Sequence, residues 1–477
     1  MVRRAILRPG LLAGLFAAVL AASAAAQAPQ VRVPLDQATI PQLEVAASQL
    51  AAAGRTAEAL QLAEVLLLRD PKNPLAHFIV GQITFRAGNT ETARQAARAS
   101  FRNADTARQH YEAARLAAQV ALADRRWFAA QYWARHTIQY APDARHRAVA
   151  VEDFRHLRAD NPWDGRLRFG IKPSDNVNGG ADGRTNVIDG YDAVGWLSGD
   201  AMALRGVAAT LNADVSYRLA RDAASETRLG AVAYARAVEL AGRPQMVPPY
   251  LPGTPAPDPV EIRNSEFSSA ALGMMLVHAR RLSADLTGRG QVEFGRSWQG
   301  GRPNYDYGQL RADLMRSLGR STLLSFGASF ERREWVDAPR DDFLRALNFG
   351  MSRGLAGGTL GFGVSASELD SSSAMARSWA VSGSVSYEPG WTLGPVHLSL
   401  GAGLATTVYP DYSIAGMRPA GGRQDDMAWA ELGLWSPKIG YAAFTPELKL
   451  QALEVTSNVS RFTRSEVSVA LGWRSAF

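Results

Sequence analysis

Hydrophobic positions recur at two different periods along this chain of 477 residues. From about residue 38 to residue 158, apolar side chains return at the spacing of an amphipathic helix, among Ala, Leu, Gln, Glu and Arg. After Asn161-Pro162-Trp163, Gly, Ser, Tyr and Trp become frequent, and apolar and polar residues alternate as they do in a strand. The pattern predicts an α + β multidomain chain, with a helical domain at 27–160 and an antiparallel β domain at 161–477.

The helical part repeats itself with a period of 34 residues. Gly54 and Gly88 are one period apart, and so are Ala59 and Ala93. This period is typical of tetratricopeptide repeats, in which Gly turns the chain between two helices and Ala lets them approach closely. We therefore expect a tetratricopeptide-like domain, with a generic bundle of α-hairpins as the alternative. Further members of the pattern are Ala63, Ala97 and Pro71, and a third unit, shifted by three residues, contains Ala130, Ala134 and Pro142.

The alternating part predicts a transmembrane β-barrel of about fourteen strands. Its strands span about 10 to 16 residues, whereas strands of soluble proteins are usually nearer five or six. Aromatic residues near the strand ends indicate the two interfacial girdles of such barrels: Tyr217, Trp298, Tyr307, Trp335, Tyr387, Trp391, Tyr409, Trp435, Tyr441 and Trp473. The expected strands are 166–173, 204–219, 226–240, 265–281, 285–299, 305–319, 321–336, 342–356, 358–371, 377–388, 394–410, 425–437, 440–456 and 462–476.

The connections between these strands set the orientation. Those at about 174–203, 241–264 and 411–424 are long, whereas the intervening ones are tight turns such as Ala356-Gly357-Gly358. Outer-membrane barrels have short periplasmic turns and longer outer loops. We therefore expect both chain ends, and the helical domain, on the periplasmic side of the bacterial outer membrane.

The N-terminus has the features of a secretory signal peptide. Arg3, Arg4 and Arg8 precede an apolar run, and Ala24-Ala25-Ala26 offers the small residues of a cleavage site. We expect residues 1–26 to be removed, because the run is too short for a membrane-spanning anchor. The sequence contains no Cys, which excludes disulfides, thiolate metal sites and Cys nucleophiles.

Charge and chemistry add few further candidates. The net charge of +7 comes from scattered Arg, so we expect no nucleic-acid partner. Neither a catalytic constellation nor a cofactor or metal motif is present, so we expect no enzyme, cofactor or metal. Asp341-Asp342 and Asp425-Asp426 could bind a cation, but adjacent pairs at loop edges are more often solvated loop charges, which we expect here. An exposed helical Arg surface is a candidate client-binding site, although such residues usually only solvate a helix: Arg86, Arg94, Arg98 and Arg102.

The end of the chain looks like a signal for barrel assembly. Phe477 closes an amphipathic strand in which Val469, Leu471 and Trp473 alternate with polar residues, while Ser475 departs from the pattern. We expect the barrel assembly machinery and outer-membrane lipid to be partners.

The segment at the start of the barrel adds a family resemblance. Its residues are Leu-Arg-Phe-Gly-Ile-Lys-Pro-Ser-Asp-Asn-Val-Asn at 167–178, followed by Gly179-Gly180-Ala181. Together with the order of signal peptide, helical repeats and barrel, this resembles the surface lipoprotein assembly modulators, often called Slam proteins. The family motif matches Asn176 and Asn178 next to Asp175, although Asn is also a common turn residue.

The resemblance implies a function as well as a layout. It implies an outer-membrane helper that moves client lipoproteins or secreted effectors to the cell surface. An exopolysaccharide export channel and a porin remain alternatives, the former because it also joins helical repeats to a barrel.

Overall fold

The computed structural model describes residues 37–477 except 190, 248–257, 415, 442–443 and 476–477. The predicted signal peptide and Phe477 lie outside the described residues. The chain divides into two compact units, one up to Gln109 and one from His110 onward. No helix of the described residues is long and apolar enough to cross a membrane.

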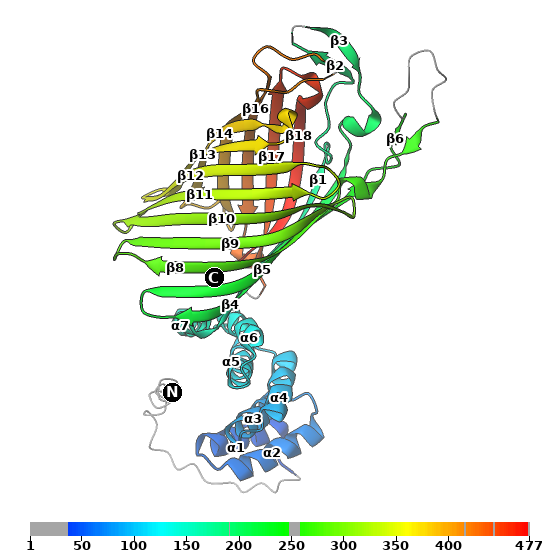
Figure 1. Ribbon diagram of the computed structural model, residues 1–477. Coiled ribbons are helices and arrows are strands. Elements are labelled where there is room, and N and C mark those ends of the chain that lie inside the picture. The colour runs from blue at the N-terminus through cyan, green and yellow to red at the C-terminus, as the bar shows by residue number, and fades with distance from the viewer. Residues whose placement is uncertain (1–36, 190, 248–257, 415, 442–443, 476–477) are drawn as a thin grey trace. The chain divides into compact units, whose positions relative to one another are not determined.

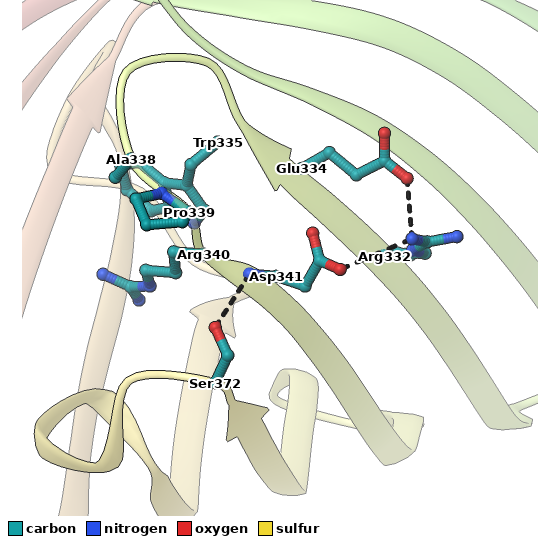
Figure 2. Close-up of a pocket in the computed structure, with 8 residues that line it drawn as sticks. All are labelled: Arg332, Glu334, Trp335, Ala338, Pro339, Arg340, Asp341 and Ser372. Carbon is teal, nitrogen blue, oxygen red and sulfur yellow. Dashed lines mark hydrogen bonds and ion pairs between the residues drawn. The ribbon is translucent and has the colours of Figure 1, made fainter.

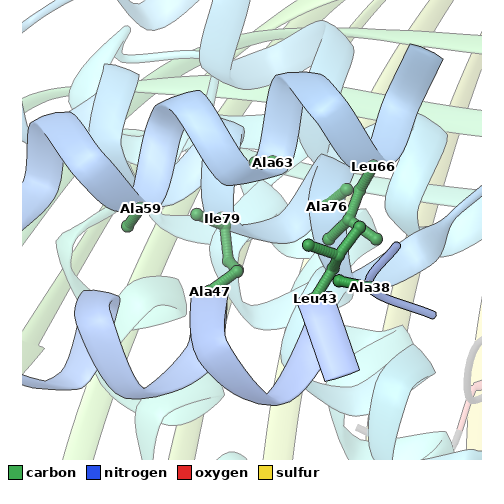
Figure 3. Packing of buried hydrophobic residues seen from close by; sticks show 8 residues of the cluster. All are labelled: Ala38, Leu43, Ala47, Ala59, Ala63, Leu66, Ala76 and Ile79. Atoms are coloured by element: carbon green, nitrogen blue, oxygen red, sulfur yellow. The ribbon is translucent and has the colours of Figure 1, made fainter. Parts of the chain in front are cut away.

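Small residues form the core of the first unit. Ala47, Ala59, Ala63 and Ala76 are fully buried, and Leu66 fills the space between their helices (Figure 3). An alanine at a crossing lets two helix backbones come close, as the 34-residue pattern predicts. The helices of this unit are α1 (Ile40–Ala52), α2 (Thr56–Arg69), α3 (Pro74–Arg86) and α4 (Thr90–Asn103).

Three helices at the start of the second unit lead into the barrel. These are α5 (Ala107–Ala123), which begins just before the division, α6 (Trp127–Gln139) and α7 (Ala144–Asp160). The last carbonyls of α7 are held by the barrel: Arg218 donates to the carbonyls of Ala159 and Asn161, both at 2.8 Å. Guanidinium groups stabilise the negative end of a helix dipole, so this contact fixes where α7 meets the first strand.

Fourteen antiparallel strands close into a barrel, as predicted (Figure 1). Each strand pairs with its neighbours in chain order, and the first strand closes against the last. The strands are β1 (Trp163–Ser174), β4 (Gly206–Arg221), β5 (Ser225–Leu240), β8 (Ser269–Arg281), β9 (Leu286–Gln299), β10 (Arg302–Leu318), β11 (Thr322–Trp335), β12 (Asp341–Leu355), β13 (Gly358–Ser371), β14 (Ser378–Pro389), β15 (His397–Tyr409), β16 (Arg423–Trp435), β17 (Phe444–Ser457) and β18 (Arg464–Ser475).

Alternation along each strand separates a lipid-type outer face from a polar lumen. Leu211 and Val215 of β4 point outward and are about two-fifths exposed, as is Phe330 of β11. The intervening side chains meet in the lumen; for example, Tyr307 donates to Glu293 at 2.8 Å. An apolar band around a polar interior is the surface of a barrel that spans a membrane.

Four of the predicted girdle aromatics lie on the lumen side instead. Tyr307 hydrogen-bonds to Glu293, and Trp335 donates to the carboxylate of Asp342 at 3.0 Å. Tyr409 and Trp435 share the inward face of their strands with Asp425 and Glu431, as the register shows. Successive side chains of a strand face lipid and lumen alternately. Closeness to a strand end therefore does not show which of the two an aromatic residue faces.

The two ends of the barrel differ in their connections. We call the end where α7 enters the helix-side end, and the opposite one the loop-side end. Tight turns join strands at the helix-side end, such as 222–224 and 356–357. Three long connections lie at the loop-side end, as predicted: 175–205, 241–268 and 410–422.

Candidate functional site at the closing seam of the barrel

The closing seam is the junction between β1 and β18. Its paired positions are Gly170–Gly472, Ile171–Leu471 and Ser174–Ser468. On its other edge, β1 pairs with β4 at every residue from Trp163 to Ser174. Pro173 interrupts the seam because it has no backbone N–H to donate. Among the described residues, the seam is therefore the barrel junction with the fewest paired positions.

On the lumen side, one carboxylate holds the loop-side part of the seam together. The Glu466 Oε1 atom of β18 lies 2.6 Å from Lys172 Nζ and accepts a hydrogen bond from Ser174 Oγ at 2.9 Å. The Glu466 side chain is only 16% exposed, so the bonds are partly protected from water. A charge-assisted pair of this kind is stronger than a neutral hydrogen bond.

The predicted motif comes next and reaches across to β18. The Oδ1 atom of Asp175 accepts from the backbone N–H of Val467 at 3.0 Å. Asn176, which is 2% exposed, donates from Nδ2 to the carbonyls of Gly180 at 2.8 Å and Ser465 at 3.2 Å. Two adjacent side chains thus replace the ladder bonds that a longer β1 would make.

The other half of the motif anchors the loop that follows. Asn178 donates from Nδ2 to the carbonyls of Asp200 and Met202, and its Oδ1 accepts from the N–H of Leu204 at 2.8 Å. Val177 is buried in an apolar cluster with residues of β4 and β5. We call residues 175–178 the clamp segment, because their side chains fasten the chain after β1 to β18, to β4 and β5, and to residues 200–204.

The long loop 175–205 also docks on the loop before β18. It contains β2 (Thr185–Ile188), β3 (Tyr191–Trp196) and η1 (Gly199–Ala201). The N–H of Val187 donates to Ser460 Oγ at 2.7 Å, and Ile188 packs with Val459 and Tyr412, all of them buried. The loop-side end of the seam is therefore fastened three times, by Glu466, by the clamp segment and by this loop.

The adjacent aspartates are anchors rather than solvated charges, which corrects the sequence prediction for one of each pair. Asp342 is fully buried and accepts from Arg340, Ser371 and the Trp335 indole. Asp425 accepts from Arg423 at 2.7 Å. Both carboxylates face inward at strand starts, where they secure loops. No group of three His, Asp or Glu residues suited to a metal occurs among the described residues.

A polar cavity of about 430 Å³ opens beside the loop between β11 and β12 (Figure 2). Arg332 bridges Glu334 at 2.7 Å and Asp341 at 3.5 Å, and the N–H of Asp341 donates to Ser372 Oγ. The charges of this cavity therefore compensate one another within its own lining.

The helical Arg candidates lie on two helices of the first unit. Arg94, Arg98 and Arg102 follow one another at intervals of four residues on α4, and Arg86 belongs to the last turn of α3. Arg94 forms an ion pair with Glu91. Arg86, Arg98 and Arg102 are exposed. The structure therefore provides an exposed basic strip, while its role as a client surface stays a prediction.

The residues of the predicted assembly signal point outward from β18. Val469, Leu471 and Trp473 are each about two-fifths exposed on the lipid-type face. The centroid of the Trp473 ring lies 5.6 Å from that of Phe169 on β1, so Trp473 also contacts β1 across the seam.

Sequence reasoning missed Glu466, Ser465 and the loop at 458–463. Each becomes important only because β1 and β18 are neighbours, and nothing in the local pattern marks it. An acidic residue on the inward face of the last strand was the only available signal.

Comparisons with known proteins add little to this picture. No protein-family model matches the sequence, and no curated protein sequence matches it. Among solved structures, the chain is similar to a loop L8 deletion mutant of OmpT, an outer membrane protein of Vibrio cholerae, with 8% identity and a TM-score of 0.34 over 66% of this chain and 99% of that one. It is also similar to the outer membrane channel DcaP of Acinetobacter baumannii (11% identity, TM-score 0.36, 67% and 98% covered) and to a bacterial polysaccharide outer membrane secretin (10%, 0.33, 65% and 98%). Likenesses this distant carry no functional argument, and the fold stands on the strand pairing itself.

Proposed function

We propose that this protein is an outer-membrane translocation helper that delivers client lipoproteins or other secreted proteins to the bacterial cell surface. The resemblance of the clamp segment and of the domain order to the surface lipoprotein assembly modulators supports this proposal. The role requires binding and passage, without covalent chemistry at any residue.

The observation that carries the proposal is the uneven closing seam. Its loop-side end is fastened by Glu466 and the clamp segment, whereas among the described residues no paired position with β18 occurs along residues 167–169 of β1. An unpaired strand edge is a template on which an extended chain can add. A client arriving at the helix-side end would meet this edge first, next to a passage into the lumen.

The same geometry supports a location in the bacterial outer membrane. The apolar outer band places the barrel in a membrane, and a β-barrel with α7 and the last strand at one end fits the bacterial outer membrane. In the proposed orientation the helices lie in the periplasm, where the basic strip of α4 would meet clients, and the barrel assembly machinery would insert the barrel. Lipid of the outer membrane surrounds it.

A whole-cell display assay tests the proposal. A candidate client lipoprotein is co-expressed, and its sensitivity to protease added outside intact cells is measured. We expect display to require this protein and to be lost when residues 38–158 are deleted. The carbonyls of Ala159 and Asn161, which Arg218 holds, remain in that variant, so the barrel should still insert.

A second variant tests the basic strip. Replacing Arg86, Arg98 and Arg102 by Gln should reduce display, and replacing the exposed Arg55, Lys72 and Arg108 by Gln serves as a charge-matched control. Display that persists after the deletion removes the helices from client handling. A client that reaches the surface in cells lacking the protein overturns the translocator proposal altogether.

One observation favours the alternative of an export channel or porin. The lumen wall across β13 and β14 is lined by short side chains, among them Gly361, Gly363 and Ser384. On the neighbouring β15, the Trp429 ring of β16 covers Gly401 and Gly403. The wall of β13 and β14 leaves room for a small or linear solute. Conductance of the purified protein in planar bilayers, together with unchanged client display, would favour this alternative.

A further inference from the structure

A groove of about 480 Å³ crosses the outer face of the barrel over strands β8 to β11. Its floor is a row of small residues that the register places side by side: Gly290 pairs with Ala312, and Ala312 pairs with Ala328. Nothing lies within 4 Å of the position that a Cβ on Gly290 would occupy. The floor is therefore open along its length.

Two rows of large apolar side chains form the walls. The outward Leu310 and Phe326 are about half exposed, so the walls lie in the apolar band that contacts the membrane. Because each row follows the strand register, the groove runs across the strands rather than along them. One wall consists of Leu276, Val292, Leu310 and Phe330. On the other side of the floor, the register places Leu314 and Phe326 beside Ala312 and Ala328.

Polar and cationic groups lie at one end of the floor of the groove. His278 pairs with Gly290, and its Nδ1 atom is 2.8 Å from Thr227 Oγ1. Arg280 follows two residues later on the same outward face and is exposed. Asp222, in the turn between β4 and β5, is an acidic group near Arg280. Ionisable groups on a lipid-type face are costly within hydrocarbon, so they mark the boundary with lipid headgroups.

The row rises from that boundary into the membrane. His278 is three residues from the helix-side end of β8, whereas Ala312 is six residues from the end of β10 and Ala328 six from the start of β11. Four neighbouring strands span about 14 Å. The groove thus begins at the helix-side headgroups and leads diagonally toward the middle of the bilayer.

We propose that this groove binds one acyl chain of a phospholipid in the helix-side leaflet, with the lipid phosphate held by His278 and Arg280. The inference does not depend on the translocation role, but it rests on the membrane orientation proposed above. The helix-side position favours a phospholipid over lipopolysaccharide, whose acyl chains enter from the opposite leaflet.

Lipid titration followed by native mass spectrometry of the full mature chain tests the proposal. The probe is dioleoyl-phosphatidylglycerol added to delipidated protein in detergent. Filling the floor with Gly290→Leu and Ala312→Leu should weaken the tightest binding event at least tenfold. The matched control, Gly383→Leu with Ala366→Leu, places the same changes on the outer faces of β14 and β13 and should bind like the unmodified protein.

A second measurement needs no variant that alters folding. The unmodified protein is placed in dioleoyl-phosphatidylglycerol vesicles that contain a trace of the same lipid with a photoreactive acyl tail, and the labelled peptides are mapped. Labelling concentrated on β8 to β11 is expected. Labelling spread evenly around the barrel, or equal affinity of the filled and control variants, overturns the proposal. Displacement of the probe by lipid A at lower concentration than by phosphatidylglycerol overturns the phospholipid as its source.

Discussion

Arg125 lies in the turn between α5 and α6, at the position that Gly54 occupies between α1 and α2 and Gly88 between α3 and α4. Its φ is 56°, close to those of Gly54 at 75° and Gly88 at 82°. The same hydrogen bonds close each turn: Arg125 donates to Leu122 and Arg126 to Ala121, just as Gly88 donates to Phe85. The left-handed conformation is strained for a residue with a Cβ, so Arg125 lowers the free energy of unfolding of these helices relative to Gly.

Replacing Arg125 by Gly should therefore stabilise the helices. We expect Arg125→Gly to raise their free energy of unfolding by about 1 kcal/mol, and Gly88→Ala to lower it by a similar amount. Chemical denaturation of the mature chain, followed by circular dichroism at 222 nm, measures both. The control is Arg126→Gly, because Arg126 has an ordinary φ of −86° and gains nothing from glycine. A stabilising Arg126→Gly would contradict the explanation.

His136 is fully buried among aromatic rings, with Tyr132 at 4.6 Å and Tyr441 at 5.0 Å between ring centroids. Burial, assisted by the nearby His110, lowers the pKa of its imidazole from 6.5 to about 4. The neutral form is therefore the one that the fold accepts.

Stability of these helices should accordingly fall on mild acidification. Between pH 6.5 and pH 4 the unfolded chain binds a proton that the folded chain excludes, so stability is complete above pH 6.5 and is lost as the pH approaches 4. The loss is at most about 3 kcal/mol. Thermal melts between pH 7 and pH 4 measure it, and His136→Phe should flatten the dependence. An unchanged slope in that variant would assign the effect to another group.

Residue chemistry alone could not separate a turn from a functional motif at Asn176 and Asn178. Both interpretations expect Asn with Gly nearby, and the structure shows that the amides bond to backbone groups on two sides. One partner, Ser465, is 289 residues away along the chain. Local sequence contains no information on such a pairing, which depends on barrel closure.

At the level of elements, the strands were predictable and their loops were not. Period-two alternation is a strong signal over 12 to 17 residues, so all fourteen strands appear close to their expected positions. β2 and β3 are only four and six residues long, and they lie in a loop where no alternation is visible. Their structure depends on docking against Val459 and Ser460, which the local pattern does not encode.

Glu466 should govern the stability of the β1–β18 junction. Replacing it by Gln leaves Lys172 without its anionic partner on a partly buried wall, which should cost about 2 kcal/mol. The temperature at which heated samples lose their compact migration on gels should fall by several degrees. The control is Glu368→Gln, since Glu368 pairs with Arg345 at an exposed position and such pairs contribute little. Equal shifts in both variants would show that Glu466 has no special part in closure.

For the whole molecule, closure is the feature that joins distant parts of the sequence. The residues of the clamp segment, the inward Glu466 and the docked first loop all act at one end of one junction. The composition and periodicity predicted a barrel with an even number of strands, but not that fastening would be concentrated at the loop-side end. Under the proposed function, that asymmetry raises the question whether clients pass through the seam or through the lumen.

Locking the seam should discriminate between these two passages. Ile171 and Leu471 are directly paired and both face outward, so Ile171→Cys with Leu471→Cys brings two thiols within reach of a disulfide. The chain has no Cys of its own, and no competing bridge can form. We expect oxidation to stop client display and a reductant to restore it. The control pair, Ala366→Cys with Val381→Cys, locks an ordinary junction between β13 and β14 and should leave display unchanged. Display that persists with the locked seam would show that β1 and β18 need not separate for client transport. The lumen would then be the better candidate for the path of the client.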